Sequence, residues 1–482
     1  MFQASLKWTG TAAVALALTL GGCSDDNSSS PQPDQGMTKD DGALADQGMM
    51  DDDGVGDAMM AGDGSAGVQL KVKITNVSSA RAFVKSGAFD TPVGKSSPGP
   101  ALPGDAFEVT FSAPLGSALS FATMFGQSND LFYAPDEQGI ALYGSDGTPT
   151  SGDVTAMVKL WDAGTEKNEE PGLGPSQAPR QGAKNTGPAD PNNTVRPAED
   201  SFNNLPAVSD VIKVTLTPMA GSMFRLRIED VSTASTLKTS DNTSHPAPVS
   251  PGVWVVHTMD APLFESGKAD RGDGLEAQAE DGDPSTLAAT LAADSGVTQL
   301  VSPGVWVVHS AGMPLFASGK VQRGDGLEAQ AEDGDPSTLA AAVSSKAGVE
   351  SSGTFTTPDG ASQAGPLGPG QRYSFTITAM PGDRLSFTTM LGQSNDLFLS
   401  PDDTGVALFD AGGQPVSDIT PMIRLWDAGT EKNQEPGIGP DQAPRQAGKN
   451  TGEAESKPVG PVSDGFTYPE VSDLLEVTIS PL

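Results

Sequence analysis

Residues 119–130 have the sequence LSFATMFGQSND, and residues 385–396 repeat it as LSFTTMLGQSND. The repeat resumes further along the chain, with LWDAGTEKNEEPGLGPSQAPR at 160–180 and LWDAGTEKNQEPGIGPDQAPR at 425–445. The offset between the copies is 266 residues for the first pair and 265 for the second, so the spacing is kept to within one residue. Self-similarity of this kind indicates the duplication of a whole domain.

The ends of the two copies also match. VSDVIKVTLTP at 208–218 closes the first copy, and VSDLLEVTISP at 471–481 closes the second. We therefore expect two tandem domains, at 68–218 and 222–482. A chain of 482 residues is long enough for them, because all-β domains commonly exceed 150 residues.

Apolar and polar side chains alternate in short segments of both copies. Val68, Leu70, Val72 and Ile74 alternate with polar residues, and the segment FRLRI at 224–228 has the same two-residue period. This period is typical of half-buried antiparallel strands. The segments are separated by turns rich in Gly and Pro, of which the chain has 57 and 39. The sequence thus predicts a predominantly all-β protein with an antiparallel β-sandwich in each half.

A shorter repeat, 52 residues long, lies inside the second expected domain. SPGVWVVH occurs at 250–257 and again at 302–309, and GDGLEAQAEDGDPSTLAA follows each copy. We expect each unit to form a strand, a loop and two short solvated helices, which makes a helical insert of the second domain at about 250–345. The first expected domain lacks this unit. We therefore expect 68–218 to need the second half of the chain to cover an edge strand.

The N-terminal region predicts export and a lipid anchor. Residues 1–22 combine Lys7 with a short apolar run, as signal peptides do. The sequence LGGC that ends at Cys23 resembles a bacterial lipobox, so we expect Cys23 to be lipidated and the protein to lie at the outer membrane or cell surface; the alternative is a free thiol. Residues 23–67 are rich in Asp and lack aromatic residues, which predicts a disordered acidic tether.

Composition and motifs exclude several classes of protein. Asp and Glu number 62 against 28 Lys and Arg, for a formal net charge of −34, whereas nucleic-acid binding requires clustered cations. We expect no nucleic-acid partner. The single cysteine excludes a disulfide framework. Because the sequence has no nucleophile elbow, zinc-protease helix, phosphate-binding loop or dinucleotide fingerprint, we also expect no enzyme.

The motif WDAGTE offers the clearest chemistry, and it occurs once in each copy. Two carboxylates four residues apart around a Gly can converge on one hard cation, Ca²⁺ first, with loop carbonyls as further ligands. An Asp in each SND segment is a candidate third carboxylate. Equally, these acids could cap turns or lie in solvent, and the residues alone favour neither interpretation. The acids concerned are Asp130, Asp162 and Glu166 in the first copy, and Asp396, Asp427 and Glu431 in the second.

Together, the hydrophobic run, the Ser-x-Asp loop and the WDAGT motif with its Pro-containing tail resemble the spondin N-terminal domain. The resemblance covers most of 68–218 and 222–482. It implies a C2-like β-sandwich of the kind found in matrix and surface proteins, with a calcium site at one end. The implied ligands are the same six residues, Asp130, Asp162 and Glu166, then Asp396, Asp427 and Glu431.

This sequence departs from the family pattern in three ways. Leu131 and Leu397 follow the loop Asp where the family has Trp. Glu166 and Glu431 stand where the family has Asp, so the carboxylate lies one methylene further from the backbone. The family's cysteines are absent, and no disulfide braces the loops.

Histidines are few, and two of them, His257 and His309, end the two VWVVH segments. A metal pair is conceivable, but each His is expected to form local hydrogen bonds because the two occupy equivalent places in separate copies. The function that these patterns predict is a lipid-anchored envelope protein with two calcium-binding sandwiches that bind an extracellular protein or glycan, as in adhesion. The alternatives are a hydrolase of envelope polysaccharide and a structural surface protein without a ligand.

Overall fold

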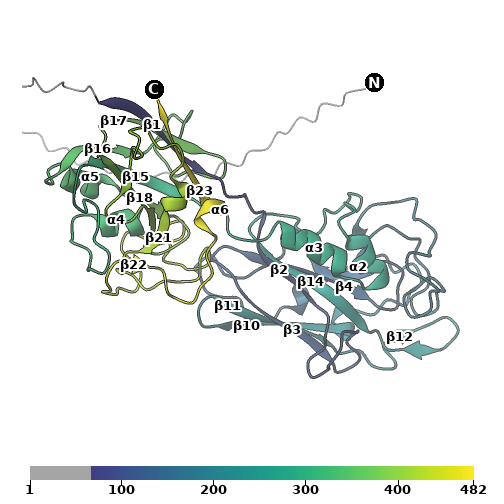
Figure 1. The fold of residues 1–482 in the computed structure, drawn as a ribbon. Helices are drawn as coiled ribbons and strands as arrows, with labels where there is room; N and C mark the ends of the chain where they lie inside the picture. The colour runs from purple at the N-terminus through teal and green to yellow at the C-terminus, as the bar shows by residue number, and fades with distance from the viewer. Residues whose placement is uncertain (1–66) are drawn as a thin grey trace, which may run out of the picture. The chain divides into compact units, whose positions relative to one another are not determined.

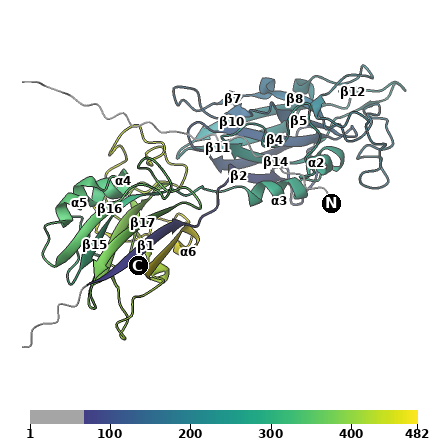
Figure 2. The same ribbon diagram turned by 90° about the horizontal axis from the view of Figure 1, so that it is seen from above.

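The computed structural model describes residues 67–482, which form two β-sandwiches (Figures 1 and 2). Antiparallel strands dominate and the helices are few and short, which confirms the predicted all-β fold. The signal peptide, Cys23 and nearly all of the expected tether lie outside the described residues. Among residues 67–482, no helix has the length and apolar character that crossing a bilayer requires.

The first sandwich is made from one continuous stretch of chain. Its strands are β2 (Phe83–Phe89), β3 (Ala106–Ser112), β4 (Ala118–Phe125), β5 (Leu131–Pro135), β6 (Ile140–Ala141), β7 (Gly152–Asp153), β8 (Val158–Asp162), β9 (Arg196–Pro197), β10 (Ile212–Met219), β11 (Met223–Asp230), β12 (Leu237–Lys238), β13 (Ser244–His245) and β14 (Val249–His257). Its helices are η1 (Thr155–Met157), α1 (Val208–Val211), α2 (Leu275–Asp281) and α3 (Ser285–Ala293).

Two sheets of the first sandwich pack face to face. One has the order β2-β14-β4-β5-β8-β9, with β6 against β4, and the other has the order β3-β11-β10-β7. Their inner faces carry large apolar side chains; for example, the rings of Phe111 on β3 and Trp254 on β14 stack with centroids 5.1 Å apart. This layer is the main core of the sandwich.

The second sandwich repeats this architecture with a different chain order. Its elements are β1 (Val68–Asn76), β15 (Val301–His309), α4 (Leu327–Glu332), α5 (Ser337–Val343), β16 (Val349–Phe355), β17 (Arg372–Ala379), β18 (Arg384–Leu391), β19 (Leu397–Ser400), β20 (Val406–Ala407), η2 (Thr420–Met422), β21 (Arg424–Asp427), β22 (Gly460–Pro461), α6 (Val471–Leu474) and β23 (Leu475–Pro481). The sheets have the orders β16-β15-β18-β19-β21-β22, with β20 against β18, and β17-β1-β23.

Helices cover the outer face of the larger sheet in both sandwiches. In the first, α2 and α3 pack on this face, and Val253 and Val255 of β14 point into the second core that lies between. Trp254 and Val256 of the same strand point into the main core. Burial on both faces explains why VWVVH is apolar throughout and does not alternate.

The 52-residue unit is shared between the sandwiches, which corrects the expectation that both copies belong to the second domain. β14 lies between β2 and β4 of the first sandwich, and β15 lies between β16 and β18 of the second. Each sandwich therefore has one such strand and one pair of helices. β14 pairs with both β2 and β4, so the first sandwich takes an inner strand from beyond residue 218, and the expectation that 68–218 needs the second half stays a prediction.

The expected division at 68–218 and 222–482 also differs from the observed strand pairing. β1 pairs with β17 and β23 of the second sandwich, whereas β11 takes the same position between β3 and β10 of the first. The second sandwich thus combines β1 with the chain from β15 onward, and the first is inserted between them. Since β1 and β11 have the same alternation, their sequences do not say which sheet each one joins.

Candidate functional site

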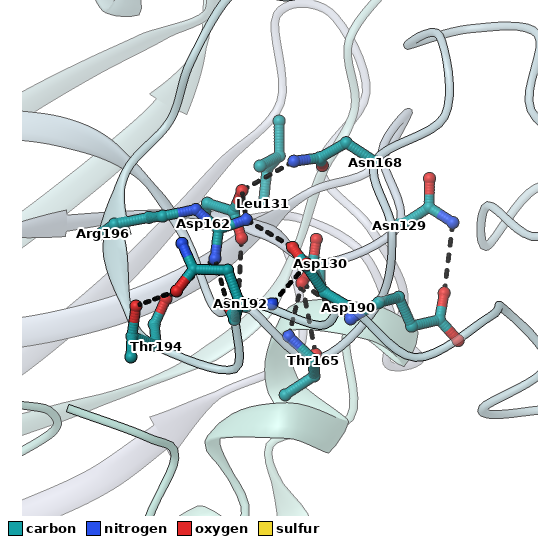
Figure 3. A network of polar contacts seen from close by, with 12 residues as sticks. Asn129, Asp130, Leu131, Asp162, Thr165, Asn168, Asp190, Asn192, Thr194 and Arg196 are labelled. Carbon is teal, nitrogen blue, oxygen red and sulfur yellow. Dashed lines mark hydrogen bonds and ion pairs between the residues drawn. The ribbon is translucent and has the colours of Figure 1, made fainter. Parts of the chain in front are cut away.

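The ends of two neighbouring strands bring the predicted acids of the first sandwich together. Asp130 immediately precedes β5, and Asp162 is the last residue of β8. Because Leu131 is paired with Asp162 in the antiparallel register, the carboxylates of Asp130 and Asp162 emerge at the same edge of the sheet (Figure 3). The Ala163 N–H donates to the Asp130 backbone carbonyl at 3.1 Å and ties the two loops together.

Asp130 is fully buried and its two carboxylate oxygens differ. Oδ2 accepts hydrogen bonds from the N–H groups of Thr165 at 2.9 Å and Glu166 at 3.1 Å, and from the Thr165 hydroxyl at 3.3 Å. Oδ1 is buried and has no hydrogen-bond partner. Burial, and then the charge of Asp162, raise the pKa of Asp130 to about 7.

Asp162 is held by the loop that follows it. Its Oδ1 accepts from the Gly164 N–H at 2.7 Å, and its Oδ2 accepts from Asn168 Nδ2 at 2.6 Å and Arg196 Nη2 at 2.7 Å. Gly164 has φ +74°, and a Cβ there would lie 2.4 Å from the Thr194 carbonyl oxygen. The Gly of the motif is therefore required by a tight turn that passes close to another backbone segment.

Glu166 is buried but faces different partners. Its Oε2 accepts from Asn129 Nδ2 at 3.1 Å, and its Oε1 accepts from the Gly187 N–H at 2.5 Å. Both oxygens are thus satisfied by the protein. The structure places Asp130 and Asp162 together as predicted, but it directs Glu166 to a hydrogen-bonding role that supports the loop around Gly187.

The second sandwich builds the same arrangement. Asp396 Oδ2 accepts from the N–H groups of Thr430 at 2.7 Å and Glu431 at 3.1 Å, while its Oδ1 is buried without a partner. Asp427 accepts from the Gly429 N–H at 2.7 Å and from Asn433 Nδ2 at 2.9 Å. Burial, and then the charge of Asp427, raise the pKa of Asp396 to about 7.

Glu431 repeats the behaviour of its counterpart in the first sandwich. Its oxygens accept from Asn395 Nδ2 at 3.2 Å and from the Gly452 N–H at 2.8 Å. Over residues 67–482, no three His, Cys, Asp or Glu side chains are arranged to hold a metal ion between them. A cation at either site would therefore be held by two carboxylates with neutral oxygens, not by the three carboxylates that the resemblance implies.

One acid of each sandwich was missed by sequence reasoning. Glu280 on α2 and Glu332 on α4 are each 2% exposed, which corrects the expectation of solvated helices. Both oxygens of Glu280, and Oε1 of Glu332, have no hydrogen-bond partner. Burial raises the pKa of each to about 8, and the charges of Glu166 and Glu431 respectively add to the effect. The only sequence signal was that both acids recur at the same place in the two 52-residue units.

The strand-end histidines form the expected local bonds. His257 Nε2 lies 2.9 Å from the Ser120 hydroxyl and its Nδ1 faces the Met259 carbonyl. His309 makes the equivalent contacts with Ser386, at 2.9 Å, and Ala311. Burial lowers the pKa of both.

Comparison with known proteins adds no relatives. No protein-family model matches the sequence, and a search of curated proteins finds no match.

Proposed function

We propose that this chain is a lipid-anchored protein of the cell envelope in which Ca²⁺ orders the loops at Asp130 and Asp396, and that these loops bind an extracellular protein or glycan. The export and anchoring part rests on the signal-like segment and Cys23. The binding part rests on the paired carboxylates and on the resemblance to the spondin N-terminal domain.

The observation that carries the calcium proposal is the unpartnered oxygen of Asp130 and of Asp396. A buried oxygen without a donor costs about 1–3 kcal/mol, and more when it is charged. The charge of a second carboxylate, Asp162 or Asp427, acts on each of these groups as well, which increases the cost. A hard cation removes both penalties at once, because it neutralises the pair and coordinates the free oxygen.

The ligand set favours Ca²⁺ among the hard cations. Asp396 and Asp427 supply the charged oxygens, and the remaining positions fall to amide and carbonyl oxygens of the loops and to water. Ca²⁺ accepts six to eight oxygens in flexible geometry, whereas Mg²⁺ requires a near-ideal octahedron and keeps several waters. Asp396 Oδ2 accepts from the Thr430 N–H, the Thr430 hydroxyl and the Glu431 N–H, which hold the carboxylate in place before the cation arrives.

Calorimetric titration of the full chain with CaCl₂ tests the calcium proposal. We expect saturable binding that is much weaker for MgCl₂ and that falls when Asp396→Asn and Asp427→Asn are introduced together. Glu476→Gln is the matched control, because it removes a charge from the exposed face of the same sandwich. A fragment that begins at residue 222 is unsuitable because it lacks β1. The proposal fails if the double variant and the control bind Ca²⁺ alike.

Anchoring and ligand binding need separate measurements. We expect a radiolabelled fatty acid to be incorporated into the exported chain and to be absent from Cys23→Ser; equal labelling of both would contradict the anchor. Glycan arrays and surface extracts, probed with and without EDTA, should give capture that depends on Ca²⁺. Product release without capture would instead favour the polysaccharide hydrolase.

A further inference from the structure

The two candidate sites differ at one position of the sheet. In the first sandwich, Arg196 of β9 is paired with Asp162 of β8. In the second, Gly460 of β22 is paired with Asp427 of β21. The flanking pairs, Trp161 with Pro197 and Trp426 with Pro461, show that the registers are the same. Arg196 and Gly460 therefore occupy equivalent positions directly opposite the site Asp.

Arg196 places a fixed positive charge among the acids of the first site. Its Nη2 lies 2.7 Å from Asp162 Oδ2 and 2.6 Å from Asp190 Oδ2, and Figure 3 shows it directed at both carboxylates. Its Nη1 donates to the backbone carbonyls of Asn192 at 2.7 Å and Thr194 at 3.0 Å. A planar guanidinium held at both ends in this way is a stable substitute for a metal ion.

The second site lacks this charge and has more unsatisfied oxygens. Gly460 has no side chain that could replace the guanidinium. Glu455 corresponds to Asp190, because each follows an alanine that forms the equivalent isolated bridge. These bridges join Ala189 to Glu166 and Ala454 to Glu431. Glu455 has a side chain 9% exposed, and its charge contributes to the raised pKa of Asp427. Three oxygens around this site are buried without a partner, namely Asp396 Oδ1, Asn433 Oδ1 and Glu455 Oε1. Of their counterparts in the first sandwich, only Asp130 Oδ1 is in this condition.

Lys457 is a cation whose charge acts on Asp427 of the second site, and it differs from Arg196 in how it is held. Its Nζ lies 2.6 Å from Glu455 Oε2, and its side chain is 65% exposed. An exposed ammonium paired with one carboxylate is weakly held and readily displaced. It leaves Oε1 of Glu455 and Oδ1 of Asp396 free.

We infer that the second sandwich holds the calcium site of this chain, formed by the carboxylates of Asp396 and Asp427 with the amide oxygen of Asn433, and that the guanidinium of Arg196 closes the equivalent site of the first sandwich. The inference rests on the proposed function and narrows it, since it replaces two calcium-ordered loops with one, at Asp396, and leaves Asp130 without a metal. Only the second copy is ordered by Ca²⁺, while the first keeps its loop in place without a metal. The ligand is a hard divalent cation, because every available donor is an oxygen.

Reciprocal substitutions in the full chain test this assignment. Arg196→Gly opens the first site, and Gly460→Arg brings a guanidinium to the second. An Arg fits there, because Gly460 does not have a positive φ and a Cβ would meet only the Pro458 carbonyl oxygen, at 3.8 Å. Isothermal titration gives the number and affinity of Ca²⁺ ions, and Tb³⁺ luminescence excited through Trp gives an independent signal because Trp161 and Trp426 adjoin the sites.

The unaltered chain is expected to bind one Ca²⁺ with high affinity, above any weak binding by other acids. Gly460→Arg should weaken this binding at least tenfold, and Arg196→Gly should add a second ion. Loss of Arg196 could unfold its loop, so melting curves are measured for both variants. The result for Gly460→Arg tests the inference even if Arg196→Gly unfolds.

Two equal sites in the unaltered chain, with Gly460→Arg binding as before, would overturn the inference and leave the proposed function intact. If neither the unaltered chain nor Asp396→Asn binds Ca²⁺, the proposed function is refuted instead.

Discussion

Glu280 and Glu332 are the residues at which burial and charge conflict most strongly. Each lies inside its sandwich with at least one carboxylate oxygen unpartnered, and the pKa of each is raised to about 8 from an ordinary value near 4.5. A carboxyl whose pKa is higher in the folded than in the unfolded chain stays protonated in the fold over a pH range in which it ionises in the unfolded chain. Its presence therefore lowers stability progressively as the pH rises from about 4.5 to about 8.

Glu280→Gln is expected to stabilise the first sandwich in this alkaline range. Gln carries no charge at any pH, so the substitution removes the cost of holding an ionisable carboxyl in a buried place. At pH 8.5 in EDTA the free energy of unfolding should rise by roughly 1–3 kcal/mol, and at pH 4.5 it should hardly change. Glu199→Gln, on the surface of the same sandwich, is the control. Denaturant melts at both pH values measure the difference. A gain of equal size at pH 4.5 would show that the charge is not the cause.

The turn of the WDAGT motif makes a second prediction at this scale. Gly164 and Gly221 both have φ +74°, but a Cβ at Gly164 would lie 2.4 Å from the Thr194 carbonyl oxygen while one at Gly221 would meet nothing within 4 Å. Gly221→Ala should cost about 1–2 kcal/mol for its backbone conformation alone. Gly164→Ala should cost roughly 3 kcal/mol or more, because overlap of the new Cβ with the Thr194 carbonyl oxygen adds to the same backbone cost. Equal losses in thermal melts would contradict the close approach.

How far the site could be predicted from the sequence is also decided by individual residues. Asp130 and Asp162 were identified because loop acids near a Gly are a recognisable pattern, and the strand register brings them together. Glu166 carried the same signal, yet its partners, Asn129 and Gly187, lie 37 and 21 residues away. Arg196 gave no signal, because its role depends on the pairing of β9 with β8.

At the scale of elements, β14 is the strand on which the first sandwich most depends. It pairs with β2 on one side and β4 on the other, and its side chains enter both cores. A polypeptide of residues 68–218 lacks β14 and also β11, so we expect that fragment not to fold. Residues 82–296 contain every strand of the first sandwich and should melt cooperatively and give dispersed amide signals. Cooperative melting of 68–218 would show that the sandwich needs neither β14 nor β11.

Sequence patterns predicted the type of each element better than its place. VWVVH was expected to be an apolar strand, and it is one, because a strand covered on both faces has no polar side. The helices after it were also expected, but their buried faces were not. Leu275 and Ala279 of α2 face the core below the helix and Gln278 is buried with them, but the surrounding acids concealed this buried face in the sequence.

At the scale of the whole molecule, the chain order is the feature that the sequence could not specify. The repeats predicted two sandwiches correctly, but the sequence boundary between the copies is not the boundary between the folds. β1 and β11 alternate alike and could each fit either sheet, and only the pairing of β1 with β17 and β23 decides the matter.

This order predicts that deleting residues 68–76 affects the distant end of the chain. β17 and β23 would lose their shared partner, so amide hydrogen exchange should accelerate in the second sandwich. β3 and β10 should keep their protection, because β11 remains between them. Exchange measured by mass spectrometry distinguishes the two sandwiches directly. Faster exchange in β3 and β10 would mean that β1 belongs to the first sandwich.

The most direct test of the calcium claim is a crystal structure of the full chain grown with Mn²⁺ as an anomalous substitute for Ca²⁺. We predict one strong anomalous peak in the second sandwich, in contact with Asp396 Oδ1 and Asp427, and none beside Arg196. Peaks confined to other surfaces, with the Asp396 oxygen still unpartnered, would contradict the account.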